Sequence, residues 1–205
     1  MSDFRTLSAG QWQQTLIVQK SRFVAFAARV NTVAEAQAFL KSVALPDATH
    51  HCYAYLTADG QKSNDNGEPA GTAGLPILQA IESAGLSHVA VAVERYFGGI
   101  KLGTGGLARA YGQAASQVLT AIKPVVVRDC VVLGFNSSYD QQNAIHQLVQ
   151  KHGGLSTVTY QACVVWQVSL PQDKQIVFTR ELGEVMRMVP AIKIVTAHTG
   201  VEFPD

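Results

Sequence analysis

The pattern that most limits the fold of this chain begins at Pro124. From there onward, runs typical of strands and stretches with helical spacing follow in the order strand, helix, strand, strand, helix, strand. The expected elements lie at 124–135, 138–152, 155–161, 163–170, 172–187 and 191–198. The first of these helices ends in Lys151-His152-Gly153-Gly154, a basic last turn before a glycine stop. This order predicts a split β-α-β domain of the ferredoxin-like class.

The residues before Pro124, which interrupts a preceding helix, follow a different order. Strands are expected at 13–19, 22–30, 50–57 and 87–95, helices at 33–43, 75–85 and 106–122, and a polar, glycine-rich loop at 58–74. Thr32 and Glu35 have the spacing of a capping box at the start of the first helix. The change of pattern predicts an α+β chain of two domains, residues 1–130 and 131–205.

Charge and cysteine content exclude several classes of function. The net charge is +1 and 15% of the 205 residues are charged, so any site for a polyanion has to be local. The three cysteines are far apart and form no C-x-x-C pair, which argues against a zinc ribbon or a disulfide framework. The first twenty residues lack the apolar run of a signal peptide, and no stretch is long enough to span a membrane. We therefore expect a cytoplasmic protein with no membrane partner.

One segment is both rich in glycine and purely cationic. RYFGGIKLGTGGLARAYG (95–112) holds six glycines together with Arg95, Lys101 and Arg109, and it contains no acid. The loop leads into a helix, whose N-terminus carries unpaired N–H groups and attracts anions. It lacks the spacing of a Walker A motif and of a dinucleotide fingerprint, and a plain turn with solvated cations is an equally good reading.

A second glycine-rich loop, NGEPAGTAG (66–74), also leads into a helix, so the two loops are expected to share a concave surface. Glu68 in this loop is a candidate general base, but a structural ion pair with Arg95 or Lys101 is the stronger interpretation. His50, His51 and Cys52 invite a metal hypothesis. Adjacent strand residues point to opposite faces, however, so they cannot all bind one ion, and we expect neither a metal nor a cofactor.

Four segments together resemble a known family. KSRF (20–23), HHCYAY (50–55), NGEPAGTAGLPIL (66–78) and VERYFGGIKLGTGGLARAYG (93–112) are similar, in this order, to the IMPACT family in its bacterial, YigZ-like branch. The family usually shows two aspartates before Gly-Glu-Pro. Here Asp65 is present but Asn66 replaces the second, so the loop lacks a carboxylate that a divalent metal site there would need.

The resemblance implies an N-terminal domain like domain 2 of ribosomal protein S5 and a ferredoxin-like C-terminal domain, a pair that is similar to two consecutive domains of elongation factor G. Eukaryotic members of the family are regulators of translation. The cationic loop and this resemblance together favour a regulatory protein that binds RNA phosphate or the ribosome, with no strong sequence preference. An enzyme acting on a small phosphorylated ligand, or a regulator that binds a protein partner, remain alternatives.

The candidate residues follow from these loops and motifs. The candidate catalytic residues are Glu68 and His50. The candidate binding residues are Lys20, Arg22, His51, Gly71, Thr72, Arg95, Tyr96, Gly98, Gly99, Lys101, Gly103, Gly105, Gly106 and Arg109.

Overall fold

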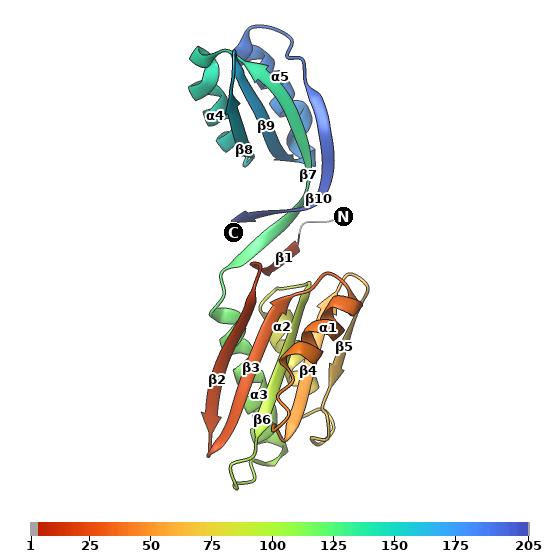
Figure 1. The fold of residues 1–205 in the computed structure, drawn as a ribbon. Coiled ribbons are helices and arrows are strands. Elements are labelled where there is room, and N and C mark those ends of the chain that lie inside the picture. The colour runs from red at the N-terminus through yellow and green to blue at the C-terminus, as the bar shows by residue number, and fades with distance from the viewer. Residues whose placement is uncertain (1–3, 205) are drawn as a thin grey trace. The chain divides into compact units, whose positions relative to one another are not determined.

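The chain, described over residues 4–204 by a computed structural model, divides into two compact units, residues 4–126 and 127–203 (Figure 1). The expected boundary at residue 130 falls inside β7 (Pro124–Ser137), a single strand that begins in the first unit and continues through the second. The β-branched valines at 125–127 and 131–132 favour strand structure on both sides of residue 130. The α+β class and the two-domain organisation are both confirmed.

The N-terminal unit is built on an antiparallel sheet of five strands. Their order is β2 (Gln11–Val18), β3 (Ser21–Arg29), β6 (Val89–Tyr96), β4 (His50–Thr57) and β5 (Gly60–Asn64). Helix α1 (Val33–Val43) covers one face, and helices α2 (Gly74–Ser83) and α3 (Gly103–Thr120) cover the other (Figure 1). The short strand β1 (Phe4–Leu7) precedes this sheet in the chain, and its Leu7 is buried in the cluster under α2 and α3.

The central strand β6 is buried on both faces. Its valines 89, 91 and 93 belong to the hydrophobic cluster under α2 and α3, whereas its alanines 90 and 92 belong to the cluster under α1. This alternation follows from the two-residue period of a strand. It explains why residues 89–93 are apolar at every position, as fully covered strands are.

Helix boundaries agree with the sequence at α1 and differ at α3. The Thr32 hydroxyl accepts the Glu35 N–H at 3.2 Å, so the predicted cap forms, but the Glu35 carboxylate accepts the N–H of Asn31 rather than that of Thr32. Helix α3 begins at Gly103, earlier than the expected residue 106, so Gly105 and Gly106 lie in its first turn. Glycine adopts loop and helical conformations with equal ease, so spacing alone cannot locate this start.

Strand β5 corrects the prediction of an unbroken loop over 58–74. Residues 60–64 pair with β4 through a tight turn, in which the Thr57 hydroxyl donates to the carbonyl of Gly60 at 2.9 Å. The strand contains no apolar residue and lies at the edge of the sheet. Backbone hydrogen bonds to β4 define this strand. The sequence of β5 shows no alternation of apolar and polar residues by which the strand could have been predicted.

The C-terminal unit has the predicted ferredoxin-like order. After β7 come α4 (Gln142–Lys151), β8 (Leu155–Tyr160), β9 (Val164–Pro171), α5 (Gln175–Met186) and β10 (Lys193–Pro204), with short 3-10 turns at Tyr139–Gln141 and Gln172–Lys174. The sheet order is β8-β9-β7-β10. The core centres on Trp166, whose indole N–H donates to the Ser137 hydroxyl at 2.9 Å. Among the helices of residues 4–204, none combines the length and apolar character needed to cross a bilayer.

Residues 1–126 expressed alone are expected to fold. All the buried members of the two clusters that sandwich the N-terminal sheet lie between Leu7 and Ile122, so the fragment retains its complete core. Circular dichroism and urea unfolding are expected to show a mixed α/β spectrum and one cooperative transition. A fragment without a cooperative transition, under conditions where the full chain is native, would contradict this expectation.

Candidate functional site

The glycine-rich loop rests on the turn between β2 and β3. Gln19 and Lys20 both have positive φ (44° and 70°), as a two-residue hairpin turn requires. The buried Ser21 hydroxyl accepts the N–H of Gly98 at 3.2 Å. A Cβ at Gly98 would lie 2.0 Å from the carbonyl carbon of Lys20. Gly98 is therefore required for packing of the loop against this turn.

A pocket of about 440 Å³ opens beside this loop. Its ionisable lining residues are His50 on β4, Glu68 in the second glycine-rich loop, Arg95 on β6 and Lys101 in the first loop. Pro69, Phe97, Leu102 and Leu107 provide its apolar walls, and the first residues of α3 complete it. The expectation that the two glycine-rich loops share one concave surface is met here.

A buried ion pair forms part of the pocket wall. The Arg95 guanidinium donates to Glu68 Oε1 at 2.5 Å, and the Tyr111 hydroxyl donates to the same oxygen at 2.8 Å. The Glu68 and Arg95 side chains are only 3% and 6% exposed. Burial raises the pKa of Tyr111, so this phenol remains protonated and remains a donor. Of the two partners expected for Glu68, the structure selects Arg95.

The imidazole of His50 has a fixed orientation. Its Nδ1 lies 2.9 Å from the carbonyl oxygen of Asn66, which only accepts, so Nδ1 carries a proton. Nε2 then lies on the other side of the ring, 3.9 Å from Glu68 Oε1. This backbone contact directs one ring nitrogen of His50 toward the ion pair in the pocket wall.

The neighbours of His50 serve other purposes. His51 lies opposite Glu94 in the strand register, and its Nδ1 is hydrogen-bonded to the Glu94 carboxylate on the face covered by α1. Burial raises the pKa of Glu94, although the Leu45 N–H and His51 oppose this shift. The Cys52 thiol donates to the carbonyl of Asp65, and burial raises its pKa to about 12. The three side chains therefore do not meet, as strand alternation predicted.

Asp65 organises the second glycine-rich loop. Its carboxylate accepts N–H groups from Gly71, Ala73 and Gly74 at 2.8–2.9 Å and so caps the start of α2. Partial burial favours a higher pKa for Asp65, but the three N–H donors outweigh it and lower this pKa. The Thr72 hydroxyl donates to the carbonyl of Pro69, and Thr72 is buried. Gly71 and Thr72 thus shape this loop.

Asn66 also has a structural role. It adopts a positive φ of 39°, which asparagine tolerates better than most residues. Its side-chain oxygen accepts the N–H of His51 at 3.1 Å, while its backbone carbonyl holds His50. Asn66, which replaces the aspartate of the family pattern, therefore holds both histidines in place in this chain.

The cations expected to bind phosphate separate into two groups. Arg95 is buried between the rings of Phe23 and Phe97, at 5.7 and 5.6 Å from their centroids. Lys101 is exposed at the pocket, and the exposed Arg109 reaches back so that its Nη1 lies 3.7 Å from the Cβ position of Gly105. The exposed cations thus gather at the start of α3.

The remaining predicted residues lie around this region. Arg22 is exposed and its guanidinium stacks 4.0 Å from the ring centre of Tyr96, whose hydroxyl donates to Asp47. Lys20 is exposed at the hairpin turn. Gly99 and Gly103 have positive φ, and no atom lies within 4 Å of their Cβ positions. Sequence reasoning missed Tyr111 and Phe97, which read as core and loop positions and carry no charge.

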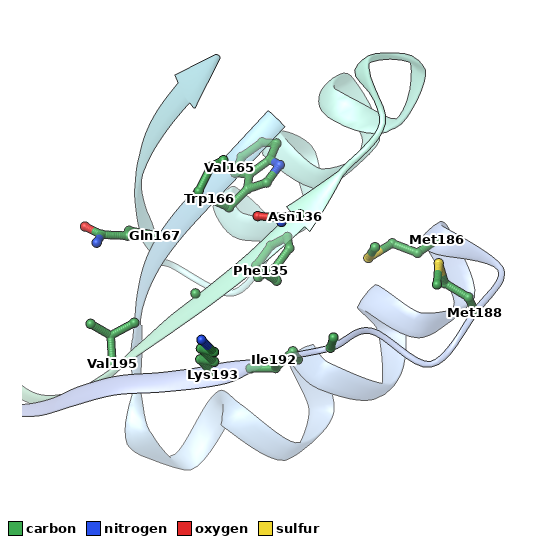
Figure 2. A pocket seen from close by; sticks show the side chains of 12 residues that line it. Phe135, Asn136, Val165, Trp166, Gln167, Met186, Met188, Ile192, Lys193 and Val195 are labelled. Carbon is green, nitrogen blue, oxygen red and sulfur yellow. The ribbon is translucent and has the colours of Figure 1, made fainter. Parts of the chain in front are cut away.

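The C-terminal unit contains a different kind of pocket. It measures about 650 Å³ and lies among β7, β9 and the segment from α5 to β10, where Met186 and Met188 face Phe135 across it (Figure 2). Among its described lining residues Lys193 is the only ionisable side chain. It therefore offers few groups for acid–base chemistry. Within residues 4–204, no three His, Cys, Asp or Glu side chains cluster closely enough to hold a metal ion.

Replacement of Asp65 by alanine is expected to lower the free energy of unfolding by about 1–2 kcal/mol, because three N–H groups, one in the loop and two at the start of α2, lose their acceptor. Since folding lowers the pKa of Asp65, its contribution is complete above about pH 4 and is lost as the pH falls through the folded value. Urea unfolding at several pH values is expected to show that the difference in the free energy of unfolding between wild type and Asp65→Ala becomes smaller in acid.

The control is Asp59→Ala, which removes a carboxylate from an exposed turn. A difference that stays constant with pH would contradict this role.

Comparison with known proteins places the chain in a family. It is 37% identical over 178 residues to IMPACT family member YigZ of Escherichia coli (strain K12), covering 83% of this chain and 87% of that protein. The chain belongs to the IMPACT family. Residues 19–119 match the Impact N-terminal domain, and this range contains every residue that lines the pocket beside His50. The resemblance inferred from the four sequence motifs is confirmed.

Other IMPACT proteins and a solved structure agree. The chain is 44% identical over 134 residues to an IMPACT family member of Thermus thermophilus, covering 65% of this chain and 74% of that protein. It is 34% identical over 190 residues to IMPACT family member YvyE of Bacillus subtilis (strain 168), covering 90% and 87%. A crystal structure described as a hypothetical protein matches with a TM-score of 0.62 and 32% identity, over 97% of this chain and all of that one.

Proposed function

We propose that this IMPACT protein is a translation-associated regulator that binds phosphate groups of RNA or the ribosome through residues 97–106. The observation that carries the proposal is the start of α3. This helix of 18 residues begins without a side-chain cap, and two exposed cations, Lys101 and Arg109, gather beside it. Its free N–H groups and partial positive charge suit a phosphate oxygen.

The charge balance around this surface supports the proposal. Glu68 is the one acid among the residues that line the pocket, and Arg95 already neutralises it. Lys101 and Arg109 therefore contribute net positive charge. The open positions at Gly99 and Gly103 leave room for a backbone to approach. These contacts position a phosphate and carry no base-reading code, so little sequence preference is expected.

The proposed RNA binding is tested by its dependence on salt. Each phosphate contact to single-stranded RNA is expected to contribute about 0.7 to the slope of log affinity against log salt. Lys101→Ala plus Arg109→Ala is therefore expected to weaken binding of an oligoribonucleotide or of ribosomes and to reduce the slope by about 1.4. Fluorescence anisotropy and ribosome co-sedimentation at several salt concentrations measure both quantities.

The control variant is Lys62→Ala plus Lys123→Ala. It removes the same charge from exposed positions on β5 and beyond the far end of α3, and it is expected to bind like wild type. Identical affinity and slope in the Lys101 and Arg109 variant and in wild type would exclude this loop as the binding surface. Regulation through a protein partner would then be the leading function.

The orientation of His50 favours one alternative, an enzyme that acts on a small phosphorylated ligand. With Nδ1 committed to the Asn66 carbonyl, Nε2 is available as an acid or base. Phosphate release from phosphomonoesters that is lost in His50→Gln would support this alternative. Equal release by the two proteins would exclude it.

A further inference from the structure

We propose that the pocket beside His50 binds a terminal nucleotide, with its phosphate monoester held by Lys101 and the first turn of α3. The inference rests on the proposed function and specifies which phosphate the surface selects. The nucleotide is either a free nucleoside monophosphate or the phosphorylated end of an RNA strand, because the two present the same chemistry to the pocket.

The buried wall of the pocket favours a terminal group. Glu68 on this wall accepts hydrogen bonds from both Arg95 and Tyr111, and all three residues are buried. A strand cannot pass between these packed side chains, so a strand end fits against this wall better than a strand that continues through it. The volume of about 440 Å³ lies in the range of pockets that hold one small ligand.

The charge of the pocket matches a monoester better than an internal phosphate. A phosphate monoester carries about −1.5 to −2 charges near pH 7, whereas an internal diester carries about −1. Glu68 and Arg95 cancel, which leaves the Lys101 ammonium and the partial charge of about +0.5 at the start of α3. The uncapped N–H groups of this first turn supply directional donors for the additional phosphate oxygens.

The walls of the pocket suit a nucleoside. Phe97 is 49% exposed, and Leu102 and Leu107 add apolar surface. An exposed aromatic ring can stack on any base, which agrees with weak sequence preference. His50 Nε2, whose position is fixed by the contact of Nδ1 with the Asn66 carbonyl, lies beside the Glu68 carboxylate, where it can hydrogen-bond a hydroxyl of the ligand.

Matched ligands test the proposal on the full chain. A short oligoribonucleotide with a 5′-phosphate, the same oligonucleotide with a 3′-phosphate, and one with hydroxyl groups at both ends are titrated by anisotropy. We expect at least one phosphorylated end to bind about tenfold or more tightly than the hydroxyl-ended strand, since the monoester gains a charge-assisted hydrogen bond. Lys101→Ala is expected to abolish this preference and Lys123→Ala to retain it.

Calorimetry with a nucleoside monophosphate and with inorganic phosphate identifies the source. If the free monophosphate displaces the phosphorylated strand, the result supports a mononucleotide as the ligand. If the protein prefers the phosphorylated strand but the free monophosphate does not displace it, the result supports an RNA end. Equal binding of phosphorylated and hydroxyl-ended strands, with no binding of the monophosphate, overturns the inference while the proposed RNA binding stands. Binding of the monophosphate without any RNA binding supports the inference and removes the proposed function. Equal affinity for inorganic phosphate and the monophosphate overturns the role of the nucleoside.

Discussion

Arg95→Met is expected to lower the free energy of unfolding by about 3–5 kcal/mol. The substitution leaves the Glu68 carboxylate, whose side chain is 3% exposed, without its opposite charge. Tyr111 alone would then hydrogen-bond Glu68 Oε1. The expected loss of stability is large because water cannot reach the buried Glu68 charge and solvate it. Urea unfolding of wild type and of the variant measures this loss.

Two comparisons isolate the ion pair from the loss of side-chain packing. Arg109→Met removes an exposed guanidinium from α3 and is expected to change stability by less than about 0.5 kcal/mol. The double variant Arg95→Met plus Glu68→Gln is expected to be more stable than Arg95→Met alone, because no charge remains buried. If the double variant were less stable than the single one by the full cost of Glu68→Gln, the two residues would not be coupled.

Gly98→Ala is expected to lower the free energy of unfolding by about 3 kcal/mol or more. The added Cβ would lie 2.0–2.4 Å from backbone atoms of Lys20 and Ser21, which are held by the hairpin turn and cannot move independently. The loop would have to separate from the turn, and the Ser21–Gly98 hydrogen bond would break. Thermal unfolding of the purified variant measures the effect.

The adjacent glycine provides the control. Gly99 has a φ of 83°, but no atom lies within 4 Å of its Cβ position. Gly99→Ala is therefore expected to cost only about 1–2 kcal/mol, from backbone strain. Equal losses in the two variants would contradict the close contact with Lys20 as the reason for glycine at residue 98.

Local patterns in the sequence determined the order of elements and the family. Hydrophobic periodicity located α1 and the ferredoxin-like order, and Thr32 marked a helix start, because each signal lies within a few neighbouring residues. Alternation along a strand also separated His50 from His51 correctly. The four motifs identified the IMPACT family, and all of them lie within the matched range 19–119.

Tertiary structure alone decided how the motifs act together. The ion pair joins residues 27 positions apart, and the contact of Ser21 with Gly98 joins residues 77 apart, so no local period encodes either. Strand register places His50 opposite Arg95, and the Asn66 carbonyl sets the imidazole orientation only after the loop has closed. Sequence showed which residues could bind an anion, whereas burial and register decided that Arg95 neutralises Glu68 while Lys101 remains exposed, because both depend on neighbours that folding brings together.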